Sequence, residues 1–122
     1  MTFRLIGYWK SDRQPDQPDP ATLVDESWNE DERHVVAMYY SRGTIARSFM
    51  GYSPCRLCGV NNGAVEYTDG VYAWPEGFVH YIEDHGVRPP ADVVEHALKM
   101  MDAIEAAKFD LSSWVSQTRP SS

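Results

Sequence analysis

Cysteine is scarce in this chain, and so is positive charge. Its 122 residues include two cysteines, and 11 Lys and Arg stand against 18 Asp and Glu, which gives a net charge of −7. A field of this sign repels a phosphate backbone, so it disfavours general nucleic-acid binding and favours solubility or a basic protein partner. The sequence has no run of about 18 apolar residues, and its start is too short and polar for a signal peptide. We therefore expect a soluble cytoplasmic protein.

The composition that is present suits one packed domain. Hydrophobic residues make up 43% of the chain and aromatic residues 12%, and a chain of this length buries roughly two-thirds of its unfolded surface. We expect a single α+β domain over residues 1–118 that includes a proline-rich connector at 14–20. Residues 119–122 are expected to be a disordered tail.

Four flanking elements are expected around the middle of the chain. Residues 3–9 and 44–50 are rich in strand formers or alternate in polarity, which predicts strands. Capping patterns between Ser27 and Glu32 predict a helix that Gly43 ends. A last helix is predicted over residues 91–108, with Met100 and Met101 filling the core. Its apolar positions recur at helical spacing, at Val94, Leu98, Met101 and Ile104.

A β-hairpin is predicted between the cysteines and the next helix. The β-rich runs 64–68 and 71–74 are separated by Asp69-Gly70, which is typical of a type I′ turn with positive φ at both positions. Its aromatic residues alternate and form either a contact patch or, as we favour, a face packed on the last helix; they are Tyr67, Tyr72 and Trp74. Pro75 suits the first turn of a helix that runs to His85.

The two cysteines are spaced C-x2-C, at Cys55 and Cys58. Disulfides rarely persist in the cytoplasm, so this spacing indicates metal binding or catalysis there. With two histidines on the following helix, the pattern reads C-x2-C-x21-H-x4-H, which supplies a tetrahedral Cys2His2 set for a structural Zn2+. The predicted ligands are Cys55, Cys58, His80 and His85. Residues 55–86 then form a zinc-finger-like ββα unit, with Gly59 allowing the tight turn behind the cysteines.

The spacing of the histidines raises a geometric question. His80 and His85 lie five positions apart, about 140° around an ideal helix. They converge if the last turn is distorted or if His85 lies just beyond it, as Gly86 would allow. Asp84 lies four positions after His80 and is a substitute ligand, while His96 is a more distant one.

Other chemistries fit the cysteines less well. A thioredoxin-like redox pair begins a helix, but Gly-Val-Asn-Asn-Gly follows Cys58 and begins a helix poorly. A zinc deaminase needs an upstream H-x-E, and His34-Val35-Val36 lacks the glutamate. The helix that carries the histidines offers no basic or amide side chain near its start for reading DNA. A plain core pair of cysteines, with His80 packing on the hairpin, stays open.

The middle of the chain resembles a family of small, uncharacterised bacterial proteins. The resemblance rests on the segments Cys55-Arg56-Leu57-Cys58-Gly59, Thr68-Asp69-Gly70, Trp74-Pro75-Glu76-Gly77 and His80-Tyr81, together with His85. N-terminal segments such as Gly7-Tyr8-Trp9 fit as well, so it covers nearly the whole chain. It implies a bacterial source and a shared architecture, and it supplies no activity.

These patterns predict a protein-binding domain rather than an enzyme. We expect an adaptor or a small inhibitor-like protein that binds an unknown protein partner, which its charge allows to be basic, through its acidic and aromatic surface. Two alternatives stay open: a nucleic-acid-associated zinc protein, and an enzyme whose zinc ion keeps an open position. The enzyme would need that open position or a nucleophile with a base, and the sequence shows neither.

Overall fold

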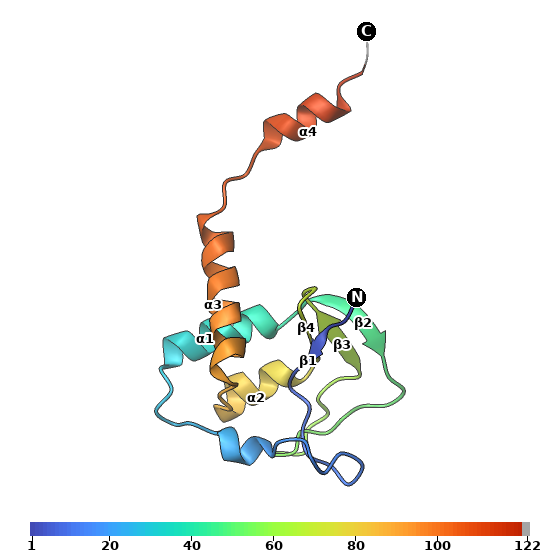
Figure 1. Ribbon diagram of the computed structural model, residues 1–122, viewed down its shortest axis with the longest axis vertical. Coiled ribbons are helices and arrows are strands. Elements are labelled where there is room, and N and C mark those ends of the chain that lie inside the picture. The colour runs from blue at the N-terminus through green and yellow to red at the C-terminus, as the bar shows by residue number, and fades with distance from the viewer. Residues whose placement is uncertain (121–122) are drawn as a thin grey trace.

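The computed structural model describes residues 1–120, which form a small α+β domain with a projecting C-terminal end (Figure 1). The sheet has the strand order β1-β4-β3-β2, with β1 parallel to β4 and the other neighbours antiparallel. The fold class predicted from the sequence is confirmed. Of the predicted tail at 119–122, residues 121–122 lie outside the described part of the chain. The strands are Arg4–Leu5 (β1), Thr44–Ser48 (β2), Val65–Thr68 (β3) and Tyr72–Pro75 (β4); the helices are Pro20–Leu23 (η1, a 3-10 turn), Glu30–Tyr40 (α1), Phe78–His85 (α2), Ala91–Ala106 (α3) and Leu111–Thr118 (α4).

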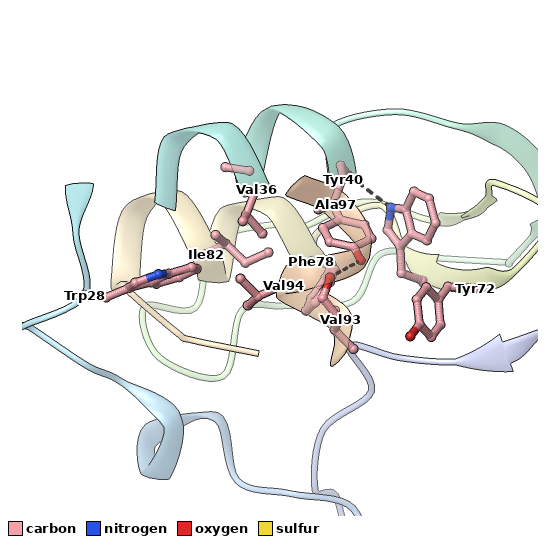
Figure 2. Close-up of a cluster of buried hydrophobic side chains, with 11 residues drawn as sticks. Trp28, Val36, Tyr40, Tyr72, Phe78, Ile82, Val93, Val94 and Ala97 are labelled. Atoms are coloured by element: carbon pink, nitrogen blue, oxygen red, sulfur yellow. Dashed lines mark hydrogen bonds between the residues drawn. The ribbon is translucent and has the colours of Figure 1, made fainter. Parts of the chain in front are cut away.

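The main core lies where α1, α2 and the first half of α3 meet the hairpin (Figure 2). Tyr40 at the end of α1 occupies its centre. The Tyr40 hydroxyl donates to the Val93 carbonyl of α3 at 2.7 Å, and the Trp74 indole N–H donates to the Tyr40 carbonyl at 3.0 Å. These bonds satisfy polar groups that would otherwise be buried without partners, and they tie α1 to both α3 and β4.

The aromatic side chains of β4 pack inward. Trp74 and Tyr72 are both buried, and Tyr72 meets His96 of α3 edge-on with ring centroids 4.9 Å apart. The expectation that a hairpin face packs on the last long helix is confirmed for Tyr72. The alternative prediction, that Tyr72 and Trp74 belong to a surface contact patch, is therefore wrong.

The hairpin turn differs from the type I′ turn that Asp69-Gly70 predicts. Among residues 1–120 only glycines have positive φ, so Asp69 does not adopt the conformation that type I′ requires. Three residues, 69–71, join the strands instead, and Gly70 has a φ of 94°. The Asp69 carboxylate accepts the N–H groups of Val71 and Tyr72 at 2.9 and 2.8 Å. This side chain stabilises the turn from within, as Asp commonly does.

Two predicted helix boundaries need correction. Pro75 is the last residue of β4 rather than the first of the helix, because the Glu76 N–H still bonds the Val65 carbonyl at 2.9 Å and α2 begins only at Phe78. Helix α1 ends at Tyr40, before Gly43. A Cβ at Gly43 would lie 2.8 Å from the Thr68 carbonyl oxygen, so close approach to β3 explains this glycine.

The chain also differs from the prediction in both edge strands of the sheet and at the C-terminus. The strand predicted over residues 3–9 has only two residues, and the strand predicted over residues 44–50 ends at Ser48. On α3, Met100 and Ile104 are exposed, so the prediction that Met100 fills the core is wrong. Helix α4 was not predicted. No described helix is both long and apolar enough to span a membrane.

A carboxylate is buried inside the sheet. The Glu66 side chain of β3 is 2% exposed and accepts two hydrogen bonds from the Arg47 guanidinium of β2, both at 2.7 Å. The Tyr8 hydroxyl donates to the same carboxylate. The bonds from Arg47 lower the pKa of Glu66 against the opposing effect of burial. Since the folded pKa is the lower one, this stabilisation is present above the ordinary glutamate pKa and is lost as pH falls through the lowered value.

We expect Arg47→Met to destabilise the fold strongly, because it leaves Glu66 charged, buried and without its cationic partner. The free energy of unfolding at pH 7, measured in urea, should fall by clearly more than it does for an ordinary surface substitution. The double variant Arg47→Met/Glu66→Gln should recover part of the loss. The deficit of the single variant should also shrink as pH falls, because burial without Arg47 favours the protonated form of Glu66. A double variant less stable than Arg47→Met would contradict this account.

Candidate metal centre

The two cysteines lie in a tight turn that the backbone closes on itself. The Cys55 N–H donates to the Val60 carbonyl and the Gly59 N–H donates to the Cys55 carbonyl, both at 2.9 Å. Gly59 has a φ of 78°, and a Cβ there would meet nothing within 4 Å, so the left-handed backbone alone favours glycine. The predicted role of Gly59 is therefore confirmed, and the turn brings both sulfurs to the same side.

This turn is attached to α2 by polar and apolar contacts. The Tyr81 hydroxyl accepts the Arg56 N–H at 2.7 Å, and the Asn62 amide donates to the Gly77 carbonyl at 3.1 Å. Beneath them lies a small buried cluster, separate from the main core, formed by Cys55, Tyr81 and Val87. These contacts fix the position of the cysteine turn relative to α2, the helix that carries the histidines.

Both histidines of α2 point at the cysteine turn. His80 lies in the first turn of the helix, and His85 is its last residue. Gly86 follows in the left-handed conformation, with a φ of 66°, which ends the helix as predicted. Despite their angular separation on the helix, the two Nε2 atoms lie 3.2 Å apart. The two side chains therefore leave α2 in different directions, and the candidate site lies where their Nε2 atoms meet.

Four donor atoms converge at this point. Cys55 Sγ lies 3.6 Å from His85 Nε2, and Cys58 Sγ lies 3.3 Å from His80 Nε2. One ligand atom from each of the four residues lies within 4.8 Å of the other three. Cys55, Cys58, His80 and His85 are therefore close enough to bind a metal ion, and these are the four residues that the sequence predicts.

The environment of the Cys55 thiol lowers its pKa. Burial raises its pKa, but hydrogen bonds from the N–H groups of Leu57 and Cys58 lower it, and the net effect is a lowered pKa. The Leu57 N–H lies 3.4 Å from the Cys55 sulfur. Thiolate is the form of cysteine that coordinates metals, so the local backbone already stabilises the form that coordination requires.

Asp84, considered above as a substitute ligand, lies beside His80 and outside the group of four donor atoms. Its Oδ2 lies 2.7 Å from Nδ1 of His80, behind the ring as seen from the cluster. A carboxylate there holds the Nδ1–H tautomer and leaves Nε2 free to coordinate. The sequence carried a signal for this pairing, because positions four apart on a helix are neighbours.

The other two histidines lie elsewhere. His96 Nε2 pairs with Asp69 Oδ2 at 2.7 Å, beside the hairpin turn, and His34 Nδ1 pairs with Glu83 Oε1 at 3.1 Å. Neither joins the cysteine cluster among the described residues. The structure therefore does not bring His96, the more distant substitute ligand, to the centre.

We expect Asp84→Asn to weaken metal binding without removing it, because the four donor atoms remain while His80 loses its orienting charge. Affinity for Zn2+, measured by competition with a chromophoric chelator, should fall at least tenfold at unchanged stoichiometry. Asp102→Asn, which replaces an exposed carboxylate on α3 by a carboxamide, is the matched control and should bind Zn2+ like the wild type. Complete loss of binding in Asp84→Asn would make Asp84 itself a ligand.

Comparison with known protein families, with curated proteins and with solved structures gives no match to this chain. The resemblance to small bacterial proteins therefore stays a prediction. What the structure contributes is the convergence of four side chains from two segments onto one point.

Proposed function

We propose that this chain is a small protein-binding domain, adaptor-like or inhibitor-like, whose fold is fastened by one structural Zn2+. The convergence of two sulfurs and two imidazole nitrogens is the observation that carries the proposal. Thiolate ligation also suits the reducing cytoplasm, where free cysteines persist. A bacterial cytoplasmic protein is accordingly the setting that we propose.

The separations between the donor atoms support zinc as the ion. In a tetrahedron with Zn–N bonds of 2.0–2.1 Å and Zn–S bonds of about 2.3 Å, two nitrogens lie about 3.3 Å apart and a nitrogen and a sulfur about 3.6 Å apart. The corresponding distances here are 3.2 Å for the nitrogen pair and 3.6 and 3.3 Å for the two sulfur–nitrogen pairs. Thiolate and imidazole together are also a donor set that zinc prefers.

A structural role follows from the number of ligands. Four protein donors complete a tetrahedron and leave no position for water or substrate. The ion would connect the cysteine turn to α2, two segments that otherwise meet through the Tyr81 hydroxyl and the small cluster around it. An open zinc position, which the enzyme alternative requires, has no support in this ligand set.

The acidic side chains indicate where a partner would bind. Residues 12–33 hold eight Asp and Glu and two Arg, so this segment alone supplies −6 of the net charge of −7. Asp25 pairs with Arg88 at 2.9 Å, but Glu26, Glu30 and Asp31 are exposed around the start of α1. A concentration of one charge on one segment attracts an oppositely charged surface. We therefore propose a basic protein segment as the partner.

The purified wild type should contain one zinc ion per chain, measured by elemental analysis. Cys58→Ser and His85→Ala should each lose most of it, because three ligands hold zinc far less well than four. His34→Ala is the matched control, since it removes a histidine outside the cluster, and it should keep the metal. Full zinc content in His85→Ala would contradict a closed four-ligand site and would favour the enzyme alternative.

Removing the metal should loosen the cysteine turn before the main core. Zinc sites of this type contribute on the order of 10 kcal/mol at neutral pH, while Tyr40 and its neighbours form a separate cluster. After chelation, amide hydrogen exchange should rise most in residues 54–61, and the backbone of α1 should keep its protection. Equal deprotection of both regions would show that the zinc site and the core unfold together.

Charge reversal around the start of α1 should abolish partner binding. The variant Glu26→Lys/Glu30→Lys/Asp31→Lys removes the attraction without touching the core. A partner captured from nuclease-treated lysate by the wild type should be missing with this variant, and its basic segment, made as a peptide, should bind less tightly as salt rises. Glu95→Lys/Asp102→Lys on α3 is the control. A partner that binds both variants equally would contradict the proposed surface.

A further inference from the structure

The apolar face of α3 continues beyond the body of the protein. In its first half, Val93, Val94 and Ala97 are buried in the main core. The same face then reaches Met100 and Ile104, which are exposed. Figure 1 shows the upper part of α3 and all of α4 projecting away from the sheet and from the other helices. The apolar face of α3 is therefore buried in its first half and exposed to solvent in its second half.

Helix α4 repeats this pattern with no support from the body. It has eight residues, and none of them is buried. Leu111, Trp114 and Val115 lie at helical spacing on one face and are 73%, 64% and 44% exposed. Just before the helix, Phe109 is 91% exposed. Isolated helices shorter than about 12–15 residues are marginal in water, so this helix needs a surface to cover its apolar face.

The exposed side chains suit an interface between proteins. We call residues 98–119 the C-terminal arm. Six of its large apolar side chains are 40–91% exposed; they are Met100, Ile104, Phe109, Leu111, Trp114 and Val115. A standard interface takes ~800 Å² from each partner, and large apolar side chains form its centre. Monomeric proteins rarely expose large apolar patches.

Charge distinguishes the arm from the rest of the chain. It contains three basic and three acidic residues, so the arm is neutral and the remaining residues carry the whole net charge of −7. Two bodies of this charge repel each other, whereas two arms do not. A strongly basic partner would be drawn to the body instead. The arm is therefore the part of the surface where a second copy of this chain can bind with least repulsion.

The connection to α4 argues against the arm folding back on its own helix. Ala107 follows α3 with φ and ψ of −65° and 144°, and Asp110 precedes α4 with −106° and 98°, so both ends of the short connector are extended. A tight helical hairpin would need a turn there. Helix α3 is about 24 Å long at 1.5 Å per residue, which also places α4 far from the core that surrounds the start of α3.

We propose that the C-terminal arm is a homodimerisation element, in which two chains pack the apolar faces of α3 and α4 against each other about a two-fold axis. Such an interface uses the same patch on both chains, so it closes at two copies and buries both exposed stripes at once. Leu111, Trp114 and Val115 form its centre, with Ile104 and Phe109 beside them.

Sedimentation analysis of the full chain over a range of concentrations tests this. The wild type should sediment as a dimer at tens of micromolar, and Leu111→Asp/Val115→Asp should raise the dissociation constant about a hundredfold, because charge would be buried in the interface. Ser116→Asp adds a charge to the opposite face of α4 and is the matched control, which should dimerise like the wild type. Since no residue of α4 is buried, all variants should keep the thermal unfolding of the body.

Two results would overturn the proposal. One is a wild type that stays monomeric at about 100 µM, which would leave the arm for a different protein or for the chain's own body. The other is a dimer that Leu111→Asp/Val115→Asp leaves intact, which would place the contact outside the arm. Neither result depends on the metal content of the protein, so this test is separate from those of the zinc site.

Discussion

The candidate metal centre depends on the packing of α2 against the main core on one face and the cysteine turn on the other. Phe78 and Ile82 bury one face of this helix in the main core, and that packing fixes the direction in which His80 and His85 leave the other. Eight residues are too few for a helix to persist alone in water. The core therefore positions two donors with no contribution from the metal. The cysteine turn supplies the other two from a segment that the sequence places more than twenty residues earlier.

The donor set could be predicted from sequence because it depends on local features. The C-x2-C spacing, the glycine behind it and two histidines on one predicted helix need no knowledge of long-range packing. The turn at Asp69 and the start of α2 could not be predicted correctly from the sequence. There, the Asp69 carboxylate and the ladder bond between Glu76 and Val65 decide the local structure, and both depend on how β3 and β4 meet. Asp84 was considered as a ligand, but its carboxylate lies 2.7 Å from Nδ1 of His80.

Long-range contacts account for what no local pattern indicated. Nothing in the sequence around Glu66 distinguishes it from an exposed strand residue, yet it is buried and joins β3 to Arg47 of β2 and to Tyr8 beyond β1. A buried carboxylate is costly unless it is paired and hydrogen-bonded. The same limit applies to α3, where helical periodicity correctly indicates an apolar face. Periodicity does not indicate where the body ends along that face, and so Met100 and Ile104 were expected inside.

The proposed arm and the proposed acidic surface have a consequence together that neither has alone. A dimer joined through neutral arms would hold two acidic bodies apart, because the exposed second half of α3 lies between each body and its α4. Both bodies then remain free to meet basic segments, and a partner with two such segments binds the second one intramolecularly. Weak, salt-sensitive contacts, typical of exposed charges, become strong through this linkage without any new interface. The proposed zinc ion would contribute to such an arrangement by keeping each body rigid, so that little conformational entropy is lost when the two sites are engaged at once.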